Sequence, residues 1–349
     1  MQTEFLIIGQ GLSGTWLSYF LEVENRSYLV IDDGSPLAPS RQAGGLLNPI
    51  TGRHKVKTWL ADELFPFAWK HYQEMGQLLG IEAIAHKNII QFFANEEAKD
   101  QFEKRVPHAP EHLEIHEEDG NWSPFFSLGN PYGVIKPVYL AQLETLLPSW
   151  RNYLLQQGKL REEIFEHASL KLHEKHSKYK DIQFEKIIFC DSRSSLSLPY
   201  FAHFPFALTK GESLIIHLKD LPDTKVYKHK LTLLPLNEPG LWWAGSSTQW
   251  EYPHENPSED YRIETMRELE NWLRVPVELV EHRCSIRTGT KERRPLVGMD
   301  PDWPQVGILN GMGTKGCTLA PFFAYQLARK LLYDESIFEE ADCAMIKKF

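Results

Sequence analysis

The residues best suited to carry chemistry lie in two glycine-rich stretches at opposite ends of the chain. The first, GQGLSG, has the G-x-G-x-x-G spacing between the apolar run 4–8 and an apolar-patterned stretch, 12–24. A turn of this kind between a strand and a helix brings backbone N–H groups to a pyrophosphate. We therefore predict a dinucleotide-binding site. In this turn the residues predicted to bind the dinucleotide are Gly9, Gly11, Leu12, Ser13 and Gly14.

Two acidic residues, Asp32 and Asp33, follow the next apolar run, 28–31. A carboxylate at the end of the second strand of a βαβ unit can accept hydrogen bonds from a ribose diol, and it disfavours a 2′-phosphate. We expect both acids to contact the cofactor. The pattern indicates an adenine dinucleotide but does not separate NAD from FAD.

The second stretch, GMGTKGCTLAP, spans residues 311–321 and opens an apolar, helix-patterned segment. Taken alone, it resembles another phosphate-binding turn at a helix N-terminus. One dinucleotide needs only one such turn, so the second stretch requires a different explanation.

These stretches must be positioned by a fold in which strands and helices alternate. Residues 4–8, 28–33 and 185–192 are typical of buried parallel strands, and 306–311 is a further strand before the last helix. Residues 81–131 and 206–282 contain mixed short strands and charged helices. We predict an α/β fold: a Rossmann-like cofactor-binding domain with a parallel sheet, and an α+β substrate domain with a mixed or antiparallel sheet.

The composition narrows the class of protein and its partners. The 349 residues include 38 basic and 47 acidic ones, a net charge of −9 that argues against broad nucleic-acid or membrane binding. We recognise no signal peptide and no apolar run long enough to span a membrane. The four cysteines form no C-x-x-C pair and the histidines are scattered, so we predict no metal site and a cytoplasmic protein.

The stretch SRQAGGLLNP (40–49) and the segment 286–321, together with the first glycine turn, resemble the D-amino-acid-oxidase-like flavoprotein family. Glycine oxidase, sarcosine oxidase and the oxidase domain of a tRNA-modifying enzyme belong to it. The resemblance implies FAD as cofactor, wrapped by the loop after the second strand. The loop residues implied are Ser40, Arg41, Ala43, Gly44, Gly45 and Leu46.

The resemblance also gives the second turn a role at the flavin ring. In this family the last helix directs its N-terminus at the ring edge that becomes negative on reduction, where the helix dipole is stabilising. The residues implied are Gly311, Met312, Gly313, Thr314, Lys315, Gly316 and Cys317. The predicted cofactor-binding domain comprises 1–80, 132–205 and 283–349, and the substrate domain comprises 81–131 and 206–282.

Three residues are implied to act on the substrate or the ring. Arg287 matches the arginine that clamps a substrate carboxylate in this family, and a structural ion pair is the alternative. Lys315 would stabilise the reduced flavin as a catalytic cation, and a solvent-facing lysine is the alternative. Arg53, with His54, is predicted to reach the ring edge and bind substrate.

Other residues depart from the family pattern or raise questions. Cys284 lies near the position of the flavin-linking cysteine of monomeric sarcosine oxidase, although a small buried residue is the alternative reading. Asp191 stands in a stretch that normally contains glycine. Arg293 and Arg294 replace an uncharged pair, which suggests an acidic or larger substrate.

The expected activity is FAD-dependent oxidation of the C–N bond of an amino acid or secondary amine, by hydride transfer to flavin N5. The alternatives are a 2-hydroxy-acid dehydrogenase, a tRNA-modifying oxidase acting on a carboxymethylaminomethyl group, and a flavin-binding subunit without catalysis. The expected partner is a small molecule, with tRNA a minor possibility, and the chain is expected to be a monomer or homo-oligomer. The residues identify neither the substrate nor the electron acceptor.

Overall fold

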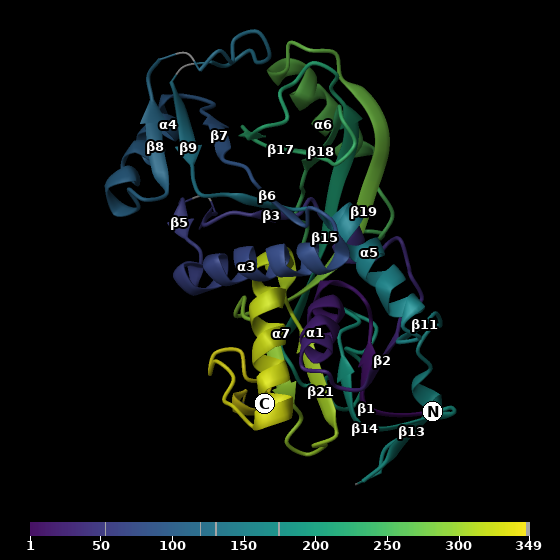
Figure 1. The fold of residues 1–349 in the computed structure, drawn as a ribbon. Helices are drawn as coiled ribbons and strands as arrows, with labels where there is room; N and C mark the ends of the chain where they lie inside the picture. Colours follow the sequence, from purple (N-terminus) through teal and green to yellow (C-terminus); the bar gives the residue numbers. More distant parts are fainter. Residues whose placement is uncertain (53, 119, 130, 174, 347–349) are drawn as a thin grey trace.

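The computed structural model describes residues 1–52, 54–118, 120–129, 131–173 and 175–346. Two large sheets lie at opposite ends of the molecule in Figure 1, and α3 (Ala61–Leu79) crosses the region between them. Both sheets have eight strands. This arrangement confirms the predicted α/β class with one largely parallel and one mixed sheet.

The first sheet is parallel at its centre. Its central strands follow the order β11-β2-β1-β14, β21 pairs parallel with β14, and the hairpin β12–β13 and strand β20 extend it antiparallel. The chain leaves the carboxyl ends of β1, β2, β14 and β21 at one edge, where a ligand of a doubly wound sheet binds. The bounds are β1 Gln2–Ile8, β2 Tyr28–Ile31, β11 Leu160–Arg161, β12 Leu170–Lys171, β13 Ser177–Tyr179, β14 Ile182–Phe189, β20 Leu296–Met299 and β21 Val306–Asn310.

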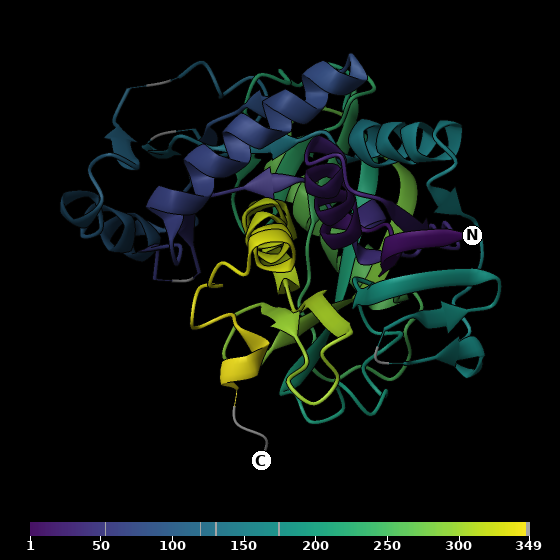
Figure 2. The ribbon, with the colours of Figure 1, turned by 60° about the horizontal axis from the view of Figure 1, so that its bottom comes forward.

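One face of this sheet is covered by helices α1 (Leu12–Val23), α3, α5 (Leu143–Gln156) and α7 (Gly316–Tyr333). Figure 2 shows these helices gathered on the same side. Apolar side chains at alternate positions of β1, such as Phe5 and Ile7, pack against them, while Leu6 and Ile8 pack into a second core on the opposite face. Burial on both faces explains why these strands are continuous apolar runs.

The second sheet is mixed and has the order β19-β15-β18-β17-β16-β7-β9-β8. The side chains of α6 (Glu259–Trp272) pack into the core on one face, and the other face turns toward the parallel sheet. The bounds are β7 Ile89–Phe92, β8 Leu113–His116, β9 Tyr132–Ile135, β15 Phe206–His217, β16 Val226–Lys228, β17 Thr232–Pro235, β18 Leu241–Gly245 and β19 Glu278–Thr290.

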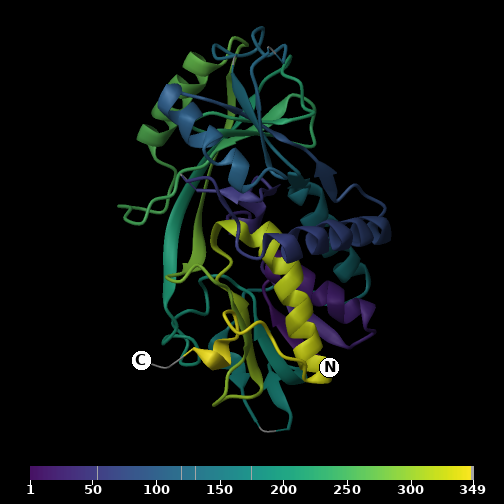
Figure 3. The ribbon, with the colours of Figure 1, turned by 90° about the vertical axis from the view of Figure 1, so that its left-hand side faces the viewer.

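Strands β15 and β19 are long and paired, and in Figure 3 they run from the mixed sheet down to the cofactor end of the molecule. The predicted domain bounds cut within β19 and assign β9, from residue 132, to the cofactor domain. Strand β9 pairs with β7 and β8 of the mixed sheet, so it lies with the other lobe. The domain division itself stays a proposal.

Shorter elements complete the fold. A three-stranded sheet follows the order β3-β10-β6, and β4 pairs with β5. These strands, the remaining helices and the short 3₁₀ turns are β3 Leu46–Leu47, β4 Ile50–Thr51, β5 Val56–Lys57, β6 Ile84–His86, β10 Tyr139–Ala141, α2 Pro39–Gln42, α4 Glu96–Glu103, η1 Val106–His108, η2 His167–Ser169, η3 Gly313–Lys315 and η4 Cys343–Met345.

Candidate functional site

A cavity of about 1000 Å³ runs from the carboxyl edge of the parallel sheet to the inner face of the mixed sheet. Both glycine-rich turns, the loop at 40–46 and several residues of β15, β16, β17, β18 and β19 line it. Polar and apolar groups both line this cavity, as expected of a site for a large cofactor and a small substrate.

The first turn is built so that only glycine fits it. Gly9 has φ +97°, and a Cβ added there would lie 2.8 Å from the carbonyl oxygen of Cys190. At Gly14 an added Cβ would lie 1.8 Å from the carbonyl oxygen of Gly9. Gly11, Leu12 and Ser13 line the cavity. The backbone is therefore brought close to the space where a pyrophosphate would lie.

Asp32 is the centre of a charged network at this end. The backbone N–H of Gln10 donates to Asp32 Oδ2 at 2.7 Å, and Arg151 Nη1 donates to Oδ1 at 2.6 Å. Arg41 forms a longer ion pair with the same oxygen, at 3.2 Å. Burial raises the pKa of Asp32, but the Gln10 and Gly34 amides and the two guanidinium groups outweigh that effect and leave the pKa below its usual value.

The ionised Asp32 can therefore accept further hydrogen bonds, as the ribose role requires. Asp33 also lines the cavity, and its Oδ1 accepts a hydrogen bond from the backbone N–H of Ser35. Both acids stay proposed cofactor ligands. Arg151, which comes from α5, was not foreseen as a partner of Asp32.

The loop after β2 packs its small residues against β17 of the mixed sheet and against β10. A Cβ at Gly44 would lie 2.3 Å from Leu234 Cδ1, and one at Gly45 would lie 2.1 Å from the carbonyl oxygen of Ala141. The Ser40 hydroxyl accepts from the backbone N–H of Leu12 at 2.9 Å, so this loop is fixed to the first turn. Ala43 and Leu46 line the cavity as well.

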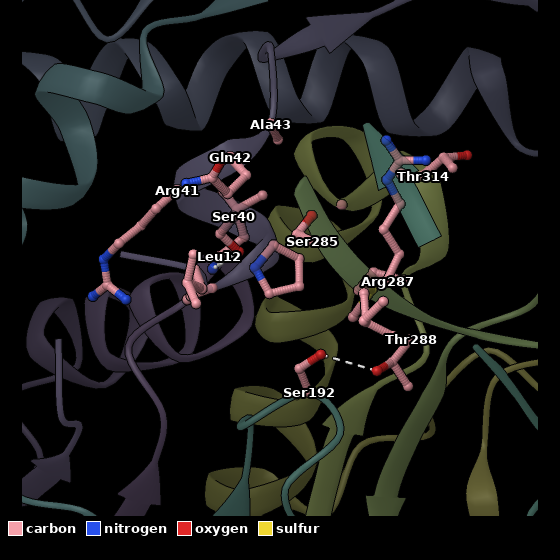
Figure 4. A pocket seen from close by; sticks show the side chains of 18 of the residues that line it. Leu12, Ser40, Arg41, Gln42, Ala43, Ser192, Ser285, Arg287, Thr288 and Thr314 are labelled. Carbon is pink, nitrogen blue, oxygen red and sulfur yellow. Dashed lines mark hydrogen bonds between the residues drawn. The ribbon is translucent and has the colours of Figure 1, made fainter. Parts of the chain in front are cut away.

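Arg41 has a different orientation from the rest of its loop. Its guanidinium donates to Gln10 and Asp32, and Figure 4 shows it extending away from Ser285 and Arg287. Its contacts therefore place it with the Asp32 network, at the end proposed for the adenosine.

The second turn meets the first. A Cβ at Gly316 would lie 3.2 Å from Leu12 Cδ1, and α1 packs against α7. Gly311 and Gly313 have φ +76° and +56°, and residues 312–317 line the cavity. The N-terminal amides of α7, an 18-residue helix, thus face the same space as the first turn.

Arg287 lies on β19, where its guanidinium rests over Gly211 of the neighbouring strand. A Cβ at Gly211 would lie 2.1 Å from Arg287 Cζ, so the absence of a side chain there makes room for the guanidinium. Arg287 Nη1 donates to the carbonyl oxygen of Ser247 at 3.1 Å, and Arg287 makes no ion pair with any carboxylate of the described residues. Figure 4 shows its side chain directed toward Thr314 of the second turn. The structural ion pair considered as an alternative is not found there.

Lys315 and Cys317 both line the cavity near this end. Burial, and then the charges of Arg294 and Arg293, lower the pKa of Lys315. Cys317 is buried, and its carbonyl oxygen accepts from the Tyr72 hydroxyl at 3.1 Å, which fixes the first turn of α7.

Several expected residues lie elsewhere. Arg53 lies outside the described residues, and His54 is exposed and does not line the cavity. Arg294 donates to Glu340 at 2.7 Å and lies over the ring of Trp59, while Arg293 is exposed. Neither of the two arginines lines the cavity, so they do not explain an acidic substrate.

Cys284 lines the cavity wall but faces away from Arg287, because residues three apart on a strand lie on opposite faces. Its thiol donates to the carbonyl oxygen of Glu255 at 3.2 Å, and burial raises its pKa. A thiol in this setting is a poor nucleophile.

Sequence reasoning missed part of the site. Ser192 follows β14 and hydrogen-bonds to Thr288 across the cavity at 2.9 Å, as Figure 4 shows. Next to it lies Asp191, noted above as a departure from the family pattern. Burial raises the pKa of Asp191 to about 7, and the Ser195 hydroxyl donates to Asp191 at 2.5 Å. Lys228 of β16 also lines the cavity and had no sequence signal.

Within the described residues, no group of histidine, cysteine or acidic side chains could hold a metal ion. The described helices likewise include none that is long and apolar enough to cross a membrane.

The residues present fit FAD. The glycine positions leave room for a cofactor backbone at two turns, the cavity is continuous between them, and the N-termini of α1 and α7 border it. Gly9, Gly11 and Gly14 would hold the pyrophosphate, and the second turn would hold the ring.

Comparisons with known proteins agree with this fit. The profile of the FAD dependent oxidoreductase (DAO) family matches residues 4–330. Glycine oxidase from Geobacillus kaustophilus superimposes with a TM-score of 0.79 at 16% identity, covering 97% of this chain and 96% of that one. Iminodiacetate oxidase from Chelativorans sp. BNC1 gives 0.78 at 17% identity, covering 95% and 96%.

A third solved structure, L-proline dehydrogenase from P. horikoshii, gives a TM-score of 0.72 at 12% identity and covers 99% of this chain and 97% of its own. These likenesses show the shared two-sheet fold, and the profile match spans nearly the whole chain. The chain therefore belongs to the DAO family of FAD-dependent oxidoreductases.

Proposed function

We propose that this enzyme oxidises the C–N bond of an amino acid, either a primary amine or an N-substituted one. The observation that carries the proposal is Arg287, a half-buried guanidinium that lines the cofactor cavity without a carboxylate partner among the described residues. Burying a charge without a partner is costly, so such a group is expected to bind an anion. A substrate carboxylate fits the planar donor geometry of arginine.

Glycine, iminodiacetate and L-proline, which give three of the structural neighbours their names, are amines that carry a carboxylate. Their chemistry supports the same substrate class for this chain. The alternative 2-hydroxy acids also carry a carboxylate, so the assay must include them.

FAD held by the two glycine-rich turns would supply the two-electron oxidant that accepts a hydride from the substrate carbon, and an external acceptor would reoxidise it. The substrate thereby becomes an imine and releases a proton, and water hydrolyses the imine to a carbonyl compound and an amine. The protein contributes orientation: Arg287 fixes the carboxylate, and a bound substrate is then held in one position relative to the ring.

Two further groups support this arrangement. Trp243 and Leu234 of the mixed sheet line the cavity and give it an apolar wall that excludes water. The N-terminus of α7 and the ammonium of Lys315 supply positive potential where negative charge develops.

The test is anaerobic bleaching of the absorption band of bound flavin at about 450 nm. Candidates are glycine, sarcosine, both enantiomers of alanine, proline and aspartate, iminodiacetate, and lactate as the 2-hydroxy acid. We expect an amino acid to bleach the band and lactate not to do so. Bleaching by lactate alone would replace the proposal with the hydroxy-acid activity.

Arg287→Lys should raise KM for the active substrate by about 10- to 100-fold, the loss expected when a bidentate charged contact becomes a single one. Gly211→Ala should act in the same direction, because its Cβ would displace the guanidinium. The matched control is Arg262→Lys on α6, where the arginine is exposed and paired with Glu259. If KM is unchanged in Arg287→Lys and in Gly211→Ala while FAD stays bound, Arg287 does not bind the substrate carboxylate.

A further inference from the structure

Lys228 lies on the same sheet face as Arg287. Strand register pairs Lys228 with Thr232, Thr232 with Gly245, and Gly245 with Ser213. The side chains of directly paired residues point to the same face of the sheet. Ser213 pairs with Arg283 on β19, and Arg287, an even number of positions further along that strand, points to the same face as Arg283. All six residues line the cavity.

No described residue balances the charge of Lys228. Its ammonium makes no hydrogen bond or ion pair with the described residues, and burial lowers its pKa. A second lysine, Lys55, lies close by and donates to Gln91 Oε1 at 2.9 Å, and Gln91 is the register partner of Lys228 on β7. Burial, and then the charge of Lys228, lower the pKa of Lys55 to about 8.

Elsewhere the chain does balance a buried lysine. Lys210 is 1% exposed, and its ammonium lies 3.0 Å from a carboxylate oxygen of Glu212. Two neighbouring lysines without a carboxylate are therefore a departure within this same protein. An anion from outside would supply the missing partner.

The acidic residues that line the cavity lie away from this pair or are already paired. Asp32, Asp33 and Asp191 follow strands of the parallel sheet, at the end proposed for the adenosine. Glu163, which follows β11, forms an ion pair with Lys180 at 3.4 Å. Glu281 forms an ion pair with Arg283 at 2.9 Å, and Glu255 pairs with Arg193. No acidic residue lines the wall formed by β16 and β17 in the described chain.

The separation of the two positive groups suits one small molecule. The Arg287 guanidinium lies over Gly211 of β15, and three strand spacings of about 4.8 Å separate β15 from β16 in the order β15-β18-β17-β16. The Arg287 guanidinium already lies at β15, so the long side chain of Lys228 has to bridge part of this interval. A compound with two carboxylates a few bonds apart can then contact both groups when the Lys228 side chain extends along the shared sheet face.

We propose that Lys228, supported by Lys55, binds a second carboxylate of the substrate, so that the enzyme prefers amino dicarboxylates to simple amino acids. This inference rests on the proposed function, because Arg287 is taken to hold the first carboxylate. The wall around Lys228 then determines specificity, separately from the groups that surround the flavin.

Binding of unreactive acids to the holoenzyme tests the inference without turnover. Acetate and propionate are compared with succinate and glutarate, and binding is followed by the shift of the flavin absorption spectrum. We expect at least one dicarboxylate to bind 10-fold or more tightly than the monocarboxylates. In Lys228→Met this preference should disappear while monocarboxylate affinity is kept, and Lys228→Arg should restore it.

The matched control is Lys225→Met, which removes a lysine just before β16 that does not line the cavity. Its dicarboxylate preference should match that of the unchanged enzyme. Equal binding of both acid classes to the unchanged enzyme, or a preference that survives Lys228→Met, would overturn the inference alone. If no acid binds and no amino acid bleaches the flavin, the proposed function fails and the inference fails with it.

Discussion

Replacement of Asp191 by asparagine should change how the stability of the protein depends on pH. Asp191 follows β14 at the cofactor end of the cavity, and burial raises the pKa of its carboxyl from 3.8 to about 7. The unfolded chain releases this proton near its ordinary pKa, whereas the folded chain holds it to near neutrality. The folded state is therefore destabilised progressively as pH rises from about 4 to about 7.

The size of the effect follows from the pKa difference. Between pH 5 and pH 8 the Asp191 carboxyl should lower the free energy of unfolding by up to about 3 kcal/mol. The side chain borders a cavity that water can enter, so we expect about 1 to 3 kcal/mol. Asparagine has no such titration and can still accept the hydrogen bond from Ser195.

Urea unfolding of flavin-free protein at pH 5 and pH 8 measures this difference. The free energy of unfolding of Asp191→Asn, measured relative to that of the unchanged protein, should be higher at pH 8 than at pH 5 by about 1 to 3 kcal/mol. The control Asp223→Asn, in an exposed loop, should change the free energy of unfolding little at either pH. A stability difference between Asp191→Asn and the unchanged protein that is the same at both pH values would refute the reasoning.

Two further predictions concern the flavin. Lys315→Met should lower the reduction potential of the bound flavin by about 30 mV, equivalent to about 1.4 kcal/mol for two electrons, because a cation near the ring favours the reduced form. Equilibration with a reference dye measures the potential, and Lys291→Met, at an exposed lysine, is the control. An unchanged potential in Lys315→Met would place the ammonium away from the ring. Acid precipitation should release all flavin from the unchanged protein and from Cys284→Ala alike, because this thiol faces away from Arg287; flavin that stays with the unchanged protein but not with the variant would show a covalent link.

Much of the fold could be predicted because its signals are local. The apolar runs that became β1, β2, β14 and β21 are buried on both faces, so their sequences differ sharply from the loops around them. The glycines of both turns are also local signals, since each is required by a backbone approach within its own turn or against an adjoining strand.

The parts that escaped prediction depend on residues distant in the chain. Lys228 occupies a three-residue strand whose sequence contains no signal for a binding site. Only the pairing of this strand with β7 and β17 places Lys228 in the cavity. The partners of Arg294, Trp59 and Glu340, come from segments far from it in the sequence and could not be foreseen. Without them, Arg294 is interpreted as a residue that binds substrate. Asp32 similarly gains Arg151 only once α5 has packed against the sheet.

The ladder between β15 and β19 carries Arg287, and the short hairpin of β16 and β17 extends the same sheet face along the cavity. The hairpin contributes nothing to the two glycine-rich turns. Leu234 of this hairpin lies against Gly44 of the loop proposed to wrap the cofactor, so a lineage of such enzymes could acquire new substrates by exchanging Lys228 and the turn 229–231 rather than the whole hairpin. Diversification by small replacements in one hairpin is the evolutionary route that this architecture favours.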